Sequence, residues 1–168
     1  MRPQLDWLTT TKTAPPSPTL HRYERMQRWP LGKWRFARAA RQAIPMLSAL
    51  QAQFQELRVG LCRAVMSAHR RVRTLDGVID PIAIGALAQL AASMVIEVSL
   101  PAGLHWSARG LTIEHLQEGN AEAVALARLD KMDWGQAALV GVPVTVTDGS
   151  GKEVARAVVS FAVAARTD

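Results

Sequence analysis

Residues 76–101 have the sequence D-G-V-I-D-P-I-A-I-G-A-L-A-Q-L-A-A-S-M-V-I-E-V-S-L-P and include the longest uncharged run of the chain, Pro81 to Ile96. Asp80 is a favourable N-cap residue, and Pro81 suits the first helical position because its φ is fixed and its missing N–H needs no partner there. This pattern predicts a central helix over 80–99. The uncharged run would be about 24 Å long, shorter than the ~30 Å of a bilayer core. It is apolar on nearly every face, so we expect it inside a protein.

Alternating apolar and polar residues on both sides of this helix predict strands. Pro143 falls inside one of them and cannot donate a ladder hydrogen bond, which indicates a sheet edge or a bulge. One apolar helix among strands indicates an α+β fold in which a sheet wraps around the helix. The predicted strands cover residues 51–59 and 62–73 before the helix, and 105–117, 121–129, 138–147 and 152–165 after it.

The 168 residues suit one domain with a single core. Residues 1–19 are rich in Pro, Thr and Ser, which predicts a disordered tail ahead of a single domain over 20–168. The apolar spacing in 20–50 predicts additional N-terminal helices. Cys62 is the one cysteine, so we expect a buried thiol, no internal disulfide and a reducing compartment. The N-terminus lacks the apolar core of a secretory signal, and we predict a cytoplasmic protein.

The charge is divided unequally along the chain. Residues 1–73 contain 14 Lys and Arg against 3 Asp and Glu, a net charge of +11, while residues 74–168 contain 6 and 11, a net charge of −5. The basic half could bind a polyanion or a cofactor phosphate, or could be a solvated surface. Its helices could touch a membrane surface, but packing on the sheet is the more common role for such helices. We expect no nucleic-acid partner, because no recognition motif accompanies the basic residues.

Two places could carry chemistry. The N-terminus of the central helix presents N–H groups and a positive dipole to a carbonyl, carboxylate or phosphate. Gln89 is the only large polar side chain between Pro81 and Ile96. We expect it to be buried, and a buried amide without partners costs on the order of 1–3 kcal/mol. It therefore bonds the overlying sheet, a second subunit or a ligand. The sequence contains no metal-ligand spacing and no phosphate-binding glycine loop, so we expect neither a metal nor a cofactor.

The residues from Val72 to Ala91, V-R-T-L-D-G-V-I-D-P-I-A-I-G-A-L-A-Q-L-A, resemble the hotdog-fold thioesterase superfamily, with the closest likeness to its DUF4442 branch. The likeness extends from about Arg35 to the C-terminus and includes E-L-R-V-G at 56–60 and W-S-A-R-G at 106–110. It implies a curved antiparallel sheet of about six strands around one long helix. It also implies a homodimer, or a dimer of dimers, that binds an acyl thioester between subunits.

The expected catalytic pattern of the superfamily is Asn-x-x-Gly-x-x-His followed by an acid nine positions after the His. In this chain Gly77 matches the glycine, whereas Thr74 stands at the Asn position, Asp80 at the His and Gln89 at the acid. Gln89 has no titratable proton, so it cannot act as a general base or as a carboxylate nucleophile. It could still orient a water molecule or a thioester.

Pro81 occupies the position whose backbone N–H polarises the thioester carbonyl in the family. Proline has no N–H, so this donor is lost unless the N–H of Ile82 replaces it, and losing one such donor typically costs about 10²–10³ in rate. If the protein is active, we expect Asp80 to act as a carboxylate base or as an organiser of the helix end.

The resemblance implies a thioesterase-like protein that binds an acyl-CoA-type thioester and could hydrolyse it. Arg73 and Arg109 are the candidate contacts to the coenzyme A phosphates, with Arg70 and Arg71 nearby in sequence. The alternative is a non-catalytic acyl- or acyl-CoA-binding module of the same fold, because Gln89 and Pro81 replace the usual acid and N–H donor.

Overall fold

The computed structural model of the protein describes residues 45–130, 134 and 139–165. Its α-helices are α3 (Pro45–Leu50) and α4 (Pro81–Ser99), and the 3-10 turn η2 covers Arg70–Val72. The strands are β1 (Gln53–Arg58), β2 (Leu61–Ser67), β3 (Leu104–His115), β4 (Glu122–Arg128), β5 (Leu139–Asp148) and β6 (Glu153–Ala165). The predicted disordered tail over 1–19 lies outside the described residues, as does the part of the predicted helices over 20–50 that precedes α3.

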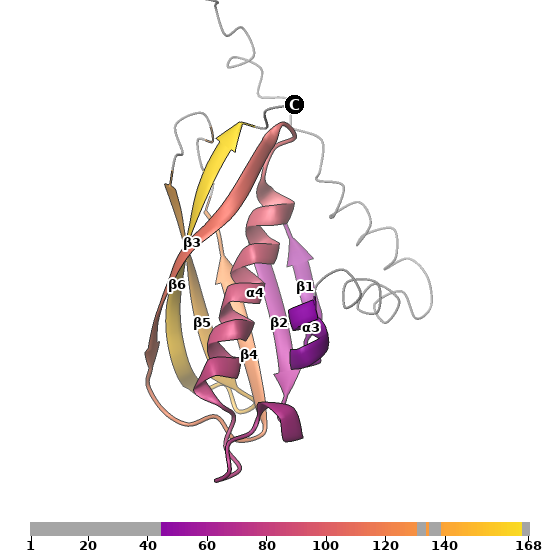
Figure 1. Cartoon of the computed structure of the whole chain (residues 1–168), viewed down its shortest axis with the longest axis vertical. Coiled ribbons are helices and arrows are strands. Elements are labelled where there is room, and N and C mark those ends of the chain that lie inside the picture. Colours follow the sequence, from indigo (N-terminus) through magenta and orange to yellow (C-terminus); the bar gives the residue numbers. More distant parts are fainter. Residues whose placement is uncertain (1–44, 131–133, 135–138, 166–168) are drawn as a thin grey trace, which may run out of the picture.

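The strands form one antiparallel sheet in the order β1-β2-β4-β5-β6-β3. The sheet curls around α4, which lies along its concave side and contacts every strand (Figure 1). The strands β1 and β3 are therefore the two edges. This arrangement confirms the predicted α+β hotdog fold, with six strands around one long helix.

The start and end of α4 follow from its terminal residues. The carboxylate of Asp80 accepts a hydrogen bond from the backbone N–H of Ile82 at 2.8 Å, and Pro81 takes the first helical position. At the other end the N–H of Leu100 bonds the carbonyl of Ile96 at 3.0 Å, and Pro101 follows. Both ends are thus set by local sequence.

By length and composition α4 could cross a membrane, with a mean hydropathy of 1.7 in its most apolar window. However, 67% of that window is buried inside the protein. The side chains of Leu87 and Val95 are completely buried, and they belong to the same core cluster as Met66 and Phe161 on the sheet. The burial of α4 is therefore that of a core helix.

The predicted strand over 62–73 is too long, because β2 ends at Ser67 and η2 follows. The side chain of His69 holds the 3-10 turn that follows β2. Its Nδ1 accepts the N–H of Arg71 at 3.3 Å, and its Nε2 lies 3.2 Å from the carbonyl oxygen of Leu50. The ring therefore caps the 3-10 turn and links it to the end of α3.

The prediction that Pro143 marks an edge position or a bulge is confirmed only locally, because β5 itself lies between β4 and β6 and its irregularity falls at Val146 and Thr147. Pro143 pairs with Val158 of β6, whereas the pairing with β4 begins only at Val144. The proline therefore occupies a part of a central strand that has one paired neighbour, where a missing N–H is tolerated.

Candidate functional site

The N-terminus of α4 is capped by a hydrogen bond between Asp80 and Ile82. Because the Asp80 carboxylate accepts the Ile82 N–H at 2.8 Å, the proposed polarising donor and the proposed base are bonded to each other. The side chain of Ile82 is 81% exposed, while Asp80 is half-buried. In this arrangement Asp80 organises the helix end. A substrate carbonyl would have to replace Asp80 on the Ile82 N–H before it could be polarised there.

The turn before α4 is held by Gly77 and Arg73. Gly77 has a φ of +85°, which a side chain would strain, and its N–H bonds the carbonyl of Thr74 at 3.1 Å. The guanidinium of Arg73 donates to the carbonyl oxygen of Gly77. Gly77 and Arg73 are predicted to contact ligand, and in the structure both hold the turn before α4. Leu75, at the tip of the same turn, is fully exposed.

Gln89 is exposed in the single chain, so the prediction of a buried amide is wrong. Its helix is buried on every side but one. Beyond the first turn of α4, residues that keep some exposure recur every three or four positions along one line, at Ala86, Gln89, Ser93 and Glu97, while Ser99 at the helix end keeps some exposure off this line. This line, which we call the open stripe, also includes Ile82 and runs the full length of the helix.

The open stripe lies beside the edge strand β3. A methyl group added to Gly85 would meet the side chains of Leu111 and Ile113 at 3.7 and 3.9 Å, so the first turns of α4 pack closely on this strand. Most of β3 is nevertheless exposed, including Leu111 at 36%. We call this region the α4–β3 seam. It consists of Ile82, Gln89 and their neighbours on the helix, together with the residues of β3 on the face toward the helix, such as Leu111 and Ile113.

Arg109 lies on the same strand, at an irregularity where the pairing of β3 with β6 shifts between Ala108 and Gly110. It is exposed. Arg73 instead belongs to the turn before α4, so the structure assigns the two candidate phosphate contacts to separate elements. Arg73 lies near Asp80 in the chain, and Gln89 is nine residues beyond Asp80, about 13 Å along a helix.

One polar pair of the seam was not predicted. The indole Nε1 of Trp106 donates to a carboxylate oxygen of Glu97 at 2.8 Å, and the Trp106 ring meets Phe161 edge to face at 5.3 Å. Glu97 was missed because it lies just beyond the uncharged run. The spacing of Gln89, Ser93 and Glu97 at intervals of four could have shown that they share one helix face.

The described residues contain no group of three or more His, Cys, Asp or Glu side chains that could hold a metal ion. Cys62 is buried, and burial raises the pKa of its thiol to about 12. A thiol in this state is a poor nucleophile, because only the thiolate reacts. The described polar groups of the seam include the Gln89 amide and the Glu97 carboxylate, which Trp106 binds, beside apolar side chains.

Comparison with known proteins agrees with this geometry. The chain is similar to a crystal structure from structural genomics, with 28% identity and a TM-score of 0.77 over 88% of this chain and 98% of that one. It is similar to a glutamine-to-alanine mutant of a thioesterase from Pseudomonas aeruginosa (17% identity, TM-score 0.68, 77% and 92% covered). It is also similar to a thioesterase from Haemophilus influenzae (15% identity, TM-score 0.66, 73% and 84% covered). No curated protein matches the chain.

The sheet curled around α4 and these similar structures define a hotdog fold of the thioesterase type. Residues 32–163 match the family described as "Domain of unknown function (DUF4442)". The match covers most of the sequence, so the chain belongs to this family. The family description gives no activity, and the function has to be argued from the seam.

Proposed function

We propose that the protein binds an acyl thioester of the coenzyme A type between two copies of the chain and hydrolyses it there. The observation that carries the proposal is the exposure of Gln89, a single amide in the middle of an apolar helix whose other faces are buried. An exposed amide that follows Ile82 and Ala86 on the open stripe suits a ligand that is mostly hydrocarbon and has one polar group to orient.

The need for a second copy follows from distance. Asp80 and Gln89 are about 13 Å apart along their own helix and cannot act on one carbonyl group. A second copy placed along the seam would bring its own Gln89 toward the Asp80 corner of the first. The edge strand β3 supports this arrangement, because it is 12 residues long and, among the described residues, pairs with β6 alone. Such an edge favours pairing with another strand.

In the proposed reaction, the amide of Gln89 from one copy positions a water molecule against the thioester carbonyl carbon. The helix end of the other copy faces the carbonyl oxygen, with the Ile82 N–H as donor. Asp80, released from this N–H by the substrate, accepts the proton of the water. The C–S bond then breaks, the protonated Asp80 returns its proton to the leaving sulfur, and a carboxylic acid and a free thiol leave. Arg73 and Arg109 are the proposed contacts to the coenzyme A phosphates. The reaction uses no metal or cofactor, and we place the protein in the cytoplasm.

A second candidate is a non-catalytic acyl- or acyl-CoA-binding module with the same site. The hydrogen bond between Asp80 and Ile82 favours it, because this bond occupies both groups that hydrolysis would need. The replacement of an acid by Gln89 favours it as well. The two candidates therefore differ in the reaction and agree on the ligand and its location.

The experiment is release of free thiol from a panel of acyl-CoAs by the wild type, Gln89→Glu and Gln89→Ala. A protein-only sample controls for Cys62. Turnover by the wild type that Gln89→Ala abolishes supports hydrolysis. Release only by Gln89→Glu indicates a complete binding site without a base, since a general base typically contributes 10²–10⁴ in rate. Unchanged turnover and unchanged acyl-CoA binding in Gln89→Ala would remove Gln89 from the site.

A further inference from the structure

The α4–β3 seam is bounded at two points along its length. Strand β3 runs antiparallel to α4, since Leu111 and Ile113 lie against Gly85 near the helix start, while Trp106 bonds Glu97 near the helix end. A methyl group added to Gly85 would already touch the side chains of both Leu111 and Ile113, so helix and strand are packed there. A side-chain hydrogen bond joins them at the other point. The part of the seam between these two points has a defined length.

This middle part of the seam is open to solvent in the single chain. Ala108 of β3 pairs with a completely buried residue of β6 and therefore points to the helix side of the sheet, yet it is exposed. It lies two residues beyond Trp106, about 7 Å along a strand. Ser93 lies four residues before Glu97, about 6 Å along a helix, so it is at the same level as Ala108. We call the region from Gln89 to Glu97, with Ala108 opposite, the seam centre.

A polar pair closes the far end of the seam centre. The indole Nε1 of Trp106 donates to the Glu97 carboxylate at 2.8 Å, and the ring is held edge to face against Phe161 at 5.3 Å. Both members of the pair are half-buried. A hydrocarbon chain that continued past this point would have to displace the indole or take the carboxylate out of water. Burial of a charge without compensating bonds is costly, so the pair is a barrier to further apolar contact.

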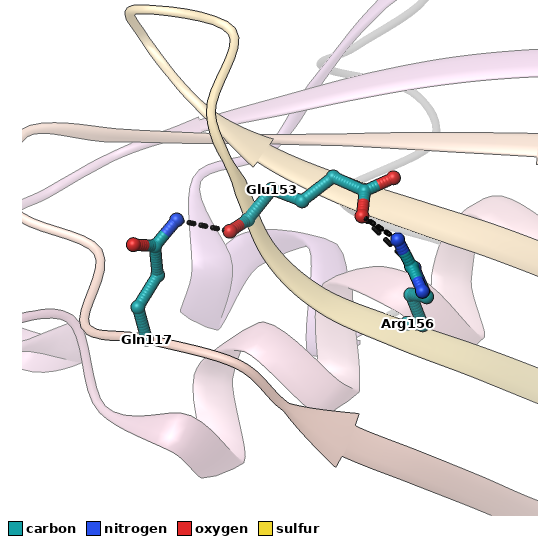
Figure 2. Close-up of polar contacts among 3 residues, drawn as sticks. All are labelled: Gln117, Glu153 and Arg156. Atoms are coloured by element: carbon teal, nitrogen blue, oxygen red, sulfur yellow. Dashed lines mark hydrogen bonds and ion pairs between the residues drawn. The ribbon is translucent and has the colours of Figure 1, made fainter.

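Strand β3 is also fixed at its opposite end. The backbone N–H of Leu116 bonds the carbonyl of Val154 at 2.9 Å, and the Gln117 side chain donates to the carbonyl oxygen of Glu153 (Figure 2). These bonds tie the chain after β3 to the start of β6. Because the strand is held at both ends, it cannot slide along α4 to lengthen the seam centre. The fold therefore sets this length.

The length of the seam centre defines the acyl chain that it can hold. Gln89 and Glu97 are eight residues apart, about 12 Å along a helix. An extended hydrocarbon with carbon–carbon bonds of about 1.5 Å covers this distance with about ten carbon atoms. In the other direction Gly85 packs on β3 only four residues from Gln89, about 6 Å along the helix. The longer path from Gln89 thus runs toward Glu97.

We infer that the pair of Glu97 and Trp106 sets the acyl-chain length, so that the protein takes medium-chain acyl thioesters of up to about ten carbon atoms. The carbonyl group lies at Gln89, and the chain runs along the seam centre of the same copy with its methyl end at the pair. Glu97 and Trp106 determine specificity and take no part in the reaction. The inference rests on the proposed function, because it needs an acyl chain beside Gln89. It holds with or without hydrolysis, since chain length acts through binding.

The test measures the Kd of a series from butanoyl- to hexadecanoyl-CoA for the full chain, with free coenzyme A as the baseline. Each buried methylene group strengthens binding about fourfold, so we expect the wild type to gain affinity up to decanoyl-CoA and no more beyond it. Glu97→Ala removes the carboxylate and frees the indole, and its affinity should keep rising to tetradecanoyl-CoA. Glu153→Ala is the matched control, because Glu153 is also a half-buried carboxylate that holds a neighbouring side chain, with Arg156 Nε at 2.9 Å (Figure 2). Its limit should equal that of the wild type.

Ala108→Leu gives an independent measurement with the opposite sign. The added side chain occupies the seam centre at the level of Ser93, about 6 Å from Gln89 along the helix. The limit should therefore fall to about hexanoyl-CoA, since half of the length is lost. Butanoyl-CoA should bind as it does to the wild type, which shows that the variant folds and keeps its site. This variant keeps the inference testable if Glu97→Ala does not fold.

Wild-type affinity that keeps rising to hexadecanoyl-CoA, or that is the same for every chain length, would overturn the inference and leave the proposed function standing. An unchanged limit in either folded seam variant would also overturn it, as would a shifted limit in Glu153→Ala. Acyl-CoAs that bind the wild type no better than free coenzyme A would overturn the proposed function itself, and the inference with it.

Discussion

The two sides of α4 differ in how strongly packing limits which residues they can contain. We call the side of α4 that faces the sheet the closed side. There Leu87, Ala91 and Val95 are completely buried, and the space between helix and sheet limits their size. On the open stripe, Ile82 and Gln89 are exposed, so packing against the described part of the chain restricts them less. The closed side therefore determines the fold. The open stripe is free to serve a partner or a ligand, and this is why the only large polar side chain in the middle of the helix lies there.

Groups on the closed side should not react with reagents in solution, and the reaction rate of the Cys62 thiol tests this. The thiol faces the core from β2, and with a pKa of about 12 its thiolate fraction at pH 8 is roughly a thousandfold below that of a thiol with the ordinary value of 9.0. Because burial raises this pKa, reactivity should return only when the protein opens. We expect the native protein to react with a thiol reagent at least a thousandfold more slowly than the protein in denaturant. Rapid modification at pH 8 without denaturant would show that the closed side opens easily.

Truncation of one large aliphatic residue on each side should separate packing from assembly. Leu87→Ala should lower the free energy of unfolding by about 2–5 kcal/mol, because it leaves a cavity between helix and sheet. Ile82→Ala should cost much less within one chain, since Ile82 is 81% exposed. Unfolding by urea at several protein concentrations checks both. The cost of Ile82→Ala should grow with assembly, because a mutation in an interface acts through a concentration-dependent equilibrium.

Two results would contradict this comparison. Equal losses for Leu87→Ala and Ile82→Ala at high dilution would mean that the open stripe packs against its own chain. A loss in Ile82→Ala that does not vary with protein concentration would mean that no second copy covers Ile82. Either result would remove the physical distinction between the closed side and the open stripe.

The sequence predicted α4 and the six strands because their signals are local. Asp80 and Pro81 determine the helix start within two residues, and alternation identifies strands over five or more. The end of β2 could not be predicted, since His69 acts through the carbonyl group of Leu50, which is 19 residues away in sequence. The place of Pro143 within a central strand could not be predicted for a similar reason, because the number of its paired neighbours depends on where β4 stops pairing.

The site was less predictable than the fold. A helix that is apolar on nearly every face gives no indication of which face its own sheet leaves uncovered, so Gln89 was expected to be buried. The order of strands resolves this point, because it leaves β3 at the edge beside the helix. The bond between Trp106 and Glu97 joins two elements and has no sequence signal of its own.

The smallest expected effect concerns Asp80, at the point where the closed side and the open stripe meet. Asp80→Ala removes the acceptor for the Ile82 N–H and should lower the free energy of unfolding by about 1 kcal/mol. Asp80→Asn is the matched variant, because asparagine caps helices about as well as aspartate but has no charge. If Asp80 serves only as a cap, the melting temperature and thiol release should both be nearly normal in Asp80→Asn. If its carboxylate accepts a proton during hydrolysis, Asp80→Asn should keep the wild-type melting temperature and lose turnover. A loss of stability in Asp80→Asn as large as that in Asp80→Ala would show that the charge at the helix end, rather than the hydrogen bond, stabilises α4.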